Sequence, residues 1–159
     1  MGDLLVRLYD LPDPAAALAA ASNAGITIKR PLPSETSLFC RWVKTHFSEG
    51  WADEVAMAFS TQPPTCLVAL DESSKLVGFA CYDATYRGFF GPTGVLESHR
   101  GKGIGTALLL GTLRAMSAAG YAYAIIGYSG ADEFYARIVG AVPINGSTPG
   151  PYHHLILRD

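Results

Sequence analysis

The segment from Arg100 to Gly105 reads Arg-Gly-Lys-Gly-Ile-Gly and lies between an apolar stretch and a long run of helix-forming residues. Its glycines permit backbone conformations in which several N–H groups turn toward one point. The first turn of the following helix adds unpaired N–H donors and the positive end of the helix dipole. Arg100 and Lys102 add formal positive charge at the rim. The segment therefore predicts a binding site for a phosphate or pyrophosphate group.

The size and charge of the chain indicate what kind of protein contains this binding site and which partners are not expected. A length of 159 residues fits one domain, and 49% hydrophobic with 16% charged residues is typical of a compact globular protein. The formal net charge of -2 gives no electrostatic footprint for nucleic acid or for an acidic membrane surface, so neither is expected as a partner. No signal peptide or membrane span is visible, and we expect a cytoplasmic protein.

The cysteines and histidines predict no metal site. Cys40, Cys66 and Cys81 show no metal-ligand spacing and have apolar neighbours, so buried free thiols in a reducing cytosol are expected. His153 and His154 are adjacent in a predicted strand and would point to opposite faces, one buried and one exposed.

Hydrophobic periodicity and turn residues predict a mixed order of elements. Helices are expected over residues 15–23, 34–47, 49–59, 103–119 and 131–138. Strands are expected over residues 4–11, 26–29, 65–70, 76–83, 89–96, 122–127 and 152–157. The order indicates an α+β or mixed α/β layout on one sheet. Pro92 and Gly94 are awkward inside a strand, and a bulge or a locally splayed strand would accommodate them.

Three classes of ligand use a glycine loop at a helix start. A P-loop needs a Lys-Ser/Thr pair after its glycines, and none follows here. A dinucleotide-binding fold places its loop after the first strand of the chain, whereas this loop comes late, after an antiparallel meander. Both of these classes fit poorly.

The third class is indicated by an ordered set of motifs. Arg100-x-x-Gly103-x-Gly105, between a strand ending near Val95 and a helix, resembles the acyl-CoA-binding motif of the GNAT (Gcn5-related) N-acetyltransferases. The later strand, the Phe-Tyr-Ala-Arg sequence of residues 134–137 and the following Gly140 are similar to the family's next landmarks. The resemblance covers residues 25–159 and implies the GNAT fold, with a splayed central sheet flanked by helices. Residues 1–24 form an added strand and helix that could cap a sheet edge or contribute to a homodimer.

The resemblance also implies acetyl-CoA as the donor of the acyl group. In this family the strand before the glycine loop parts from its parallel neighbour, and the pantetheine arm bonds the free backbone there. Pro92 and Gly94 are residue types that would help the strand to stop pairing. The cofactor-binding residues expected from the resemblance are Val95, Leu96, Glu97, Arg100, Gly101, Lys102, Gly103, Ile104, Gly105 and Thr106.

The two candidate catalytic side chains are those of Tyr135 and Glu97. Tyr135 lies where the family has a tyrosine whose hydroxyl protonates the leaving thiolate, and the backbone N–H of Val95 would meet the oxyanion. Glu97, at the end of the splayed strand, is a candidate general base with no stronger support than an ordinary loop position. The other candidate bases are Asp83, Tyr86, Tyr128, Asp132 and Glu133.

The expected activity is transfer of acetyl from acetyl-CoA to a primary amine by direct attack, with a small-molecule acceptor of unknown identity. The cysteines fall at no motif position, which argues weakly against a covalent enzyme intermediate. Two alternatives stay open. One is a non-catalytic acyl-CoA-binding sensor, which would need no acid. The other is an acetyltransferase for protein-linked or RNA-linked amines, which a basic surface patch would favour.

Overall fold

The computed structural model describes residues 2–159. Its strands form one seven-stranded sheet in the order β2-β3-β4-β5-β6-β1-β7. Among residues 2–159, neighbouring strands pair in antiparallel fashion except β5 and β6, which are parallel. The strands are β1 (Leu4–Arg7), β2 (Thr27–Lys29), β3 (Cys66–Leu70), β4 (Leu76–Tyr82), β5 (Phe89–Val95), β6 (Tyr123–Ile126) and β7 (Val142–Pro143). The mixed α/β layout expected from the sequence is confirmed.

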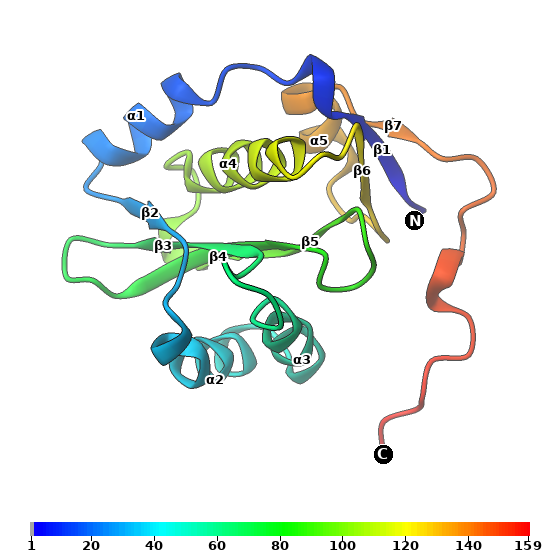
Figure 1. The fold of residues 1–159 in the computed structure, drawn as a ribbon, viewed down its shortest axis with the longest axis horizontal. Helices are drawn as coiled ribbons and strands as arrows, with labels where there is room; N and C mark the ends of the chain where they lie inside the picture. The colour runs from blue at the N-terminus through cyan, green and yellow to red at the C-terminus, as the bar shows by residue number, and fades with distance from the viewer. Residues whose placement is uncertain (1) are drawn as a thin grey trace.

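Helices cover both faces of this sheet (Figure 1). The helices α1 (Ala15–Asn23) and α4 (Ile104–Ala118) lie on one face, and α2 (Thr36–His46) and α3 (Glu49–Met57) lie on the other. The fifth helix, α5 (Asp132–Val139), packs beside β1. Each face has its own apolar core, with Leu108, Leu113 and Met116 on the α4 side and Phe39 and Val55 on the other.

The helix α4 is buried on most of its surface because its residues are mostly apolar. Residues buried along it include Ile104, Leu108, Leu109 and Leu113, and this burial on several sides holds the start of the helix firmly against the sheet. The helix ends before Gly120, whose φ of 102° suits glycine alone. The glycine segment before α4 is thereby fixed relative to the end of β5.

The strand β5 carries the irregularity that its sequence predicts. Thr93 pairs with Ala80 and Phe90 pairs with Tyr82, so Gly91 and Pro92 form a bulge in the register against β4. On its other side β5 pairs with β6 only at Phe89 and Phe90. The rest of β5 diverges from its parallel neighbour, and the expected bulge and splay are both confirmed.

Gly94 has a different role from the one expected. It still pairs with Phe79 of β4, so it does not end the ladder. A Cβ at Gly94 would lie 2.5 Å from Cε1 of Phe47, which is closer than a real side chain tolerates. Gly94 is therefore required because the Phe47 ring packs directly on the strand.

The predicted closing strand over residues 152–157 is wrong. The chain there forms a short 3-10 turn at Gly150–Tyr152 and then an irregular tail to Asp159. The strand that pairs next to β1 is instead β7, which Pro143 ends because proline cannot donate to a ladder. His153 and His154 are consequently both exposed, with ring centroids 5.8 Å apart, and not divided between a buried and an exposed face.

The beginning of the chain is part of the same sheet. The strand β1 is shorter than the 4–11 segment expected, since residues 8–10 form a 3-10 turn. It lies inside the sheet, with β6 on one side and β7 on the other, so it does not cap an edge. A domain boundary between residues 24 and 25 stays a prediction, and so does a homodimer contact.

Candidate functional site

The glycine segment has the backbone geometry of an anion-binding site. Gly101 and Gly103 have φ angles of 80° and 79°, and no atom lies within 4 Å of a Cβ built on either residue. Within residues 2–159, the N–H groups from Gly101 to Thr106 donate to no other backbone or side-chain group. The 15-residue helix α4 begins at Ile104 and points its N-terminus into this space. These features fit a phosphate or pyrophosphate group.

The two cations beside the segment lie differently. The Arg100 Nε donates to the Val95 carbonyl at 3.4 Å, and Arg100 lines the cavity between β5 and α5. Lys102 instead borders a separate hollow together with His99, Asp71 and Glu72. Arg100 is thus the cation that the structure brings to the splayed strand.

A cavity of about 450 Å³ occupies the divergence of β5 from β6. Its walls include Thr93, Gly94 and Val95 of β5 and Phe134 and Tyr135 of α5. The Leu96 N–H donates to the Val77 carbonyl at 2.9 Å, and backbone groups alternate in direction along an antiparallel strand. The N–H of Val95 therefore points away from β4 and toward this cavity, where it is free to bond a ligand.

A second cavity of about 700 Å³ adjoins the first. Both are lined by Phe90, Thr93, Ala131 and Tyr135, so these residues form the boundary between them. The walls of the second cavity include six aromatic residues and come mainly from α3, β5, the β6–α5 loop and the C-terminal tail. The two spaces can hold a donor and an acceptor that meet at Tyr135.

Tyr135 lies at the boundary between the two cavities. Its side chain is 8% exposed and packs edge-on against Phe90 at a centroid distance of 6.2 Å. The hydroxyl makes no hydrogen bond to the residues of 2–159. Burial raises the pKa of Tyr135 to about 12, so the hydroxyl keeps its proton at neutral pH. Tyr135 can therefore donate a hydrogen bond into either cavity.

Most of the candidate general bases predicted from the sequence lie outside the two cavities. Glu97 is exposed in a 3-10 turn after β5 and lines neither cavity. The Asp83 carboxylate accepts hydrogen bonds from the Gly88 N–H and the Tyr121 hydroxyl. Tyr86, Asp132 and Glu133 are exposed and line neither cavity. Among the candidates, Tyr128 alone borders the second cavity.

Glu54 is the residue of the site that sequence reasoning missed. It lies on α3, one helical turn after Trp51, and both residues line the second cavity. The Glu54 Oε1 accepts a hydrogen bond of 2.6 Å from the Thr85 hydroxyl. The one sequence signal was the i, i+3 spacing of Trp51 and Glu54, which places them on one helix face. Nothing in the spacing says which way that face points.

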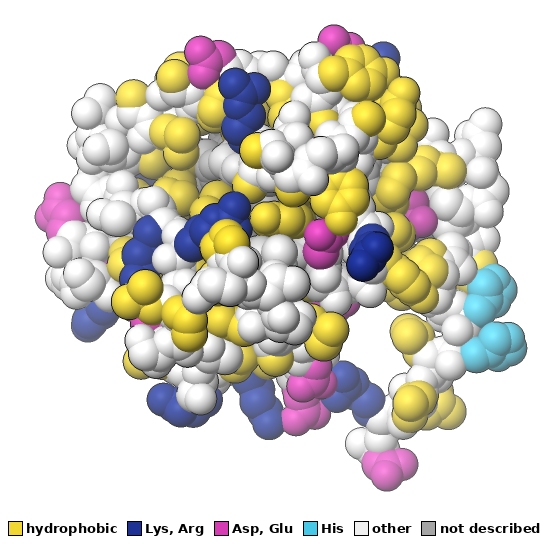
Figure 2. All heavy atoms as spheres, in the orientation of Figure 1, with side chains coloured by type: hydrophobic (Ala, Val, Ile, Leu, Met, Phe, Trp, Pro, Cys, Tyr) yellow, Lys and Arg dark blue, Asp and Glu magenta, His cyan; other side chains and the backbone are white. Residues whose placement is uncertain are grey.

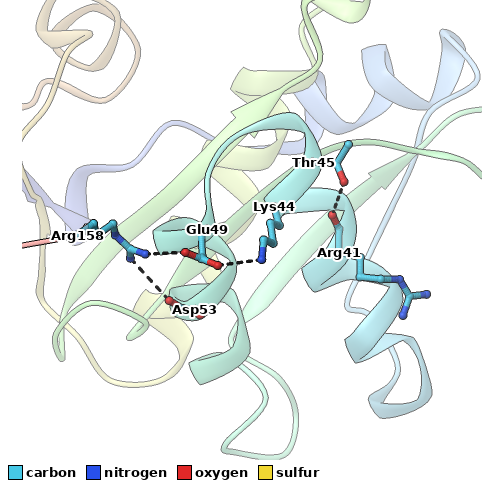
Figure 3. Close-up of polar contacts among 6 residues, drawn as sticks. All are labelled: Arg41, Lys44, Thr45, Glu49, Asp53 and Arg158. Carbon is cyan, nitrogen blue, oxygen red and sulfur yellow. Dashed lines mark hydrogen bonds and ion pairs between the residues drawn. The ribbon is translucent and has the colours of Figure 1, made fainter.

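The C-terminal tail forms part of the wall of the second cavity. Tyr152 packs edge-on against Tyr128 at 5.5 Å, and Tyr152 and Leu155 both line the cavity. Farther along, Arg158 binds the Glu49 carboxylate of α3 at 2.9 Å and approaches Asp53 at 3.8 Å (Figure 3). In the surface view the tail stands at the edge of the molecule with its histidine side chains turned outward (Figure 2).

The thiols take no part in either cavity. The three cysteines are free. Cys66 and Cys81 are buried as expected, whereas Cys40, on α2, is only partly buried, contrary to the expectation. Burial raises the pKa of the Cys81 thiol well above its usual range, which disfavours the reactive thiolate. Residues 2–159 contain no group of His, Cys, Asp and Glu side chains arranged to hold a metal ion. None of their helices is long and apolar enough to cross a membrane.

The family model for the acetyltransferase (GNAT) family matches residues 34–141, which is more than half of the chain. The protein therefore belongs to the GNAT family, the acyl-CoA-dependent N-acetyltransferases. The resemblance drawn from the glycine segment and residues 134–137 is confirmed. No curated protein sequence matches the chain.

Solved structures of low sequence identity share the fold. The GCN5-related glucosamine N-acetyltransferase region of a fungal multi-domain GH3 beta-N-acetylglucosaminidase is 16% identical with a TM-score of 0.74, covering 90% of this chain and 19% of that one. A GCN5-related N-acetyltransferase from Sphaerobacter thermophilus is 21% identical with a TM-score of 0.66, covering 90% and 48%. One from Kribbella flavida is 22% identical with a TM-score of 0.61, covering 89% and 53%. This chain thus spans about a fifth to a half of these proteins.

Proposed function

We propose that the protein transfers acetyl from acetyl-CoA to the primary amine of a small-molecule acceptor. The observation that carries this proposal is the meeting of two cavities at Tyr135, one along the free edge of β5 and one walled by aromatic residues. The first leads to the glycine segment, and the second opens beside α3 and the tail. A donor and an acceptor can enter from different sides and meet at one point.

The residues of the first cavity fit acetyl-CoA. The free N–H groups from Gly101 to Thr106 and the start of α4 suit the pyrophosphate, with Arg100 nearby. The outward-facing backbone of Val95 can hydrogen-bond the amide groups of the pantetheine arm as a further strand would. The Val95 N–H is also suitably directed to stabilise negative charge on the thioester oxygen.

The transfer itself balances simply. An ammonium acceptor first loses one proton, which is released, and its nitrogen then forms a bond to the thioester carbonyl carbon. The carbon–sulfur bond breaks, the nitrogen gives up a second proton, and the leaving thiolate takes up one proton. The products are an acetamide, the CoA thiol and one released proton. Tyr135 contributes by donating a hydrogen bond to the leaving sulfur, and the aromatic walls exclude water from the reacting atoms.

The structure offers less support for the two alternatives. A sensor of acyl-CoA would need the first cavity and the glycine segment but not the adjoining aromatic cavity. An acceptor carried on RNA would be favoured by a continuous basic surface. On the face shown in Figure 2, Lys and Arg side chains are spread in small groups among hydrophobic and uncharged ones.

The purified protein is expected to release CoA thiol from acetyl-CoA only when an amine is present. The test is a panel of primary amines followed with a thiol reagent, with acetylated product identified by mass spectrometry. Glucosamine belongs in the panel because one structurally similar domain is named for acetylation of that sugar. Tight binding of acetyl-CoA without release of thiol for any amine would instead favour the sensor.

Replacing Arg158 with alanine is expected to raise the KM for the amine about fivefold, because the tail that borders the acceptor cavity loses its ion pairs with α3. The KM for acetyl-CoA should not change. Lys44→Ala is the matched control, since Lys44 also binds Glu49, at 2.8 Å, but lies outside the tail. An equal rise of KM in both variants would show that the tail has no part in acceptor binding.

A further inference from the structure

The acceptor cavity contains one group that is charged at neutral pH. Of the residues that line it, Glu54 is the single carboxylate, and there is no lysine, arginine or histidine among them. Its other polar groups are hydroxyls, the Trp51 indole N–H and backbone atoms, and six of its lining residues are aromatic. A ligand that enters this space therefore meets one negative charge and no positive one.

The Glu54 carboxylate is held in place and left without a cation. The Thr85 hydroxyl binds one oxygen, Oε1, at 2.6 Å. The other two carboxylates of α3 are paired, Glu49 with Lys44 and Arg158, and Asp53 with Arg158 (Figure 3). No described Lys, Arg or His nitrogen lies within 4.0 Å of the Glu54 carboxylate. A partly buried and unpaired carboxylate gains most by binding a cation, because it has already lost part of its hydration.

The aromatic walls suit a cation with an apolar body. Trp51 and Tyr128 are 36% and 51% exposed, and Tyr152 and Phe89 also face the cavity. The faces of such rings attract ammonium groups and bury apolar surface. An acceptor with a carboxylate or phosphate would instead leave that anion without a partner beside Glu54, which disfavours it strongly.

We infer that Glu54 binds the ammonium group of the acceptor, and that the acceptor is a primary amine with a single positive charge and an uncharged, largely apolar or aromatic body. This inference rests on the proposed function for the identity of the cavity. Amino acids and phosphorylated amino sugars lie outside this class. Glu54 also stands where it can take the proton that the ammonium must lose before its nitrogen attacks the thioester.

The test compares phenethylamine with phenylalanine, two amines that differ by one carboxylate. Wild-type protein should acetylate phenethylamine with kcat/KM about 100-fold above that for phenylalanine, because the cavity offers no cation to the second compound. Binding of phenethylamine is measured separately by calorimetry without acetyl-CoA. Similar kcat/KM for the two amines would overturn the assignment of the acceptor class.

In Glu54→Gln, the Kd and the KM for phenethylamine should rise about 30-fold, since a charged hydrogen bond to the ammonium is lost. The KM for acetyl-CoA should stay the same. Asp10→Asn, which removes an exposed carboxylate that lines neither cavity, is the control and should match the wild type. Thr85→Val, a milder change that frees the Glu54 side chain, should raise the same constants less.

The outcomes separate this inference from the proposed function. Binding of phenethylamine that depends on Glu54, with no release of CoA thiol, would support the ammonium site and contradict the acetyltransferase proposal. Thiol release from phenethylamine that is equally fast in wild type, Glu54→Gln and Thr85→Val would sustain the enzyme and overturn the role of Glu54. Absence of any phenethylamine binding by the wild type would overturn it as well.

Discussion

Replacing Gly103 with aspartate is expected to weaken CoA binding about 100-fold, through repulsion between the new carboxylate and the pyrophosphate of roughly 2–3 kcal/mol. No protein atom lies within 4 Å of a Cβ built at Gly103, so the added side chain has room beside the segment that is proposed to bind the pyrophosphate. Aspartate and asparagine tolerate a positive φ better than other side chains do, which limits the strain at 79°. Calorimetric titration with CoA measures the effect.

Gly103→Asn is the matched control for this change. Asparagine has nearly the same shape and the same backbone tolerance but no charge, so its Kd for CoA should rise less than about tenfold. The ratio between the two variants therefore reports the charge of the ligand rather than the cost of filling the space. Equal losses in both variants would mean that the segment does not hold an anion.

The elements that the sequence predicts well are those set by local chemistry. The glycine segment requires positive φ angles, and Gly101 and Gly103 adopt them. Pro92 cannot donate to a ladder, and the bulge of β5 lies at that residue. Both features depend on residues adjacent in the chain, so a single sequence was enough to predict them.

The acceptor side of the site depends on contacts between distant segments. Glu54 reaches the cavity because α3 lies against β5 and because Thr85, from the loop after β4, fixes its carboxylate. The tail borders the same cavity and is tied to α3 by an ion pair between residues 109 positions apart. The sequence predicted a closing strand over residues 152–157, but a strand needs a partner edge, and β7 already takes the place beside β1. The residues that line the acceptor cavity are thus determined by tertiary contacts, which a single sequence does not reveal.

Replacing Tyr135 with phenylalanine is expected to lower kcat about 50-fold and to leave the KM for acetyl-CoA nearly unchanged, because a hydrogen bond to the developing thiolate is lost. With its pKa near 12, Tyr135 lies about 3.5 units above an ordinary thiol, so complete proton transfer to the sulfur is uphill. The hydroxyl should therefore act by hydrogen bonding, and no limb of the pH–rate profile below about pH 11 should belong to it. Steady-state assays of thiol release from pH 6 to 10 measure both expectations.

The stability of Tyr135→Phe separates this role from a structural one. The hydroxyl bonds no described residue, so at pH 7 the variant should unfold with the same free energy to within about 0.5 kcal/mol. Burial raises the pKa from 10.0 to about 12, so the folded state holds the proton more tightly than the unfolded state does. This contribution to stability is complete below pH 10 and is lost as pH rises toward 12. At pH 11.5 the loss in the free energy of unfolding is about 2 kcal/mol. Urea unfolding at pH 9 and pH 11.5 should show this loss in the wild type and not in Tyr135→Phe. A variant that is unstable at pH 7, with kcat lowered only in proportion to its unfolded fraction, would refute the catalytic role.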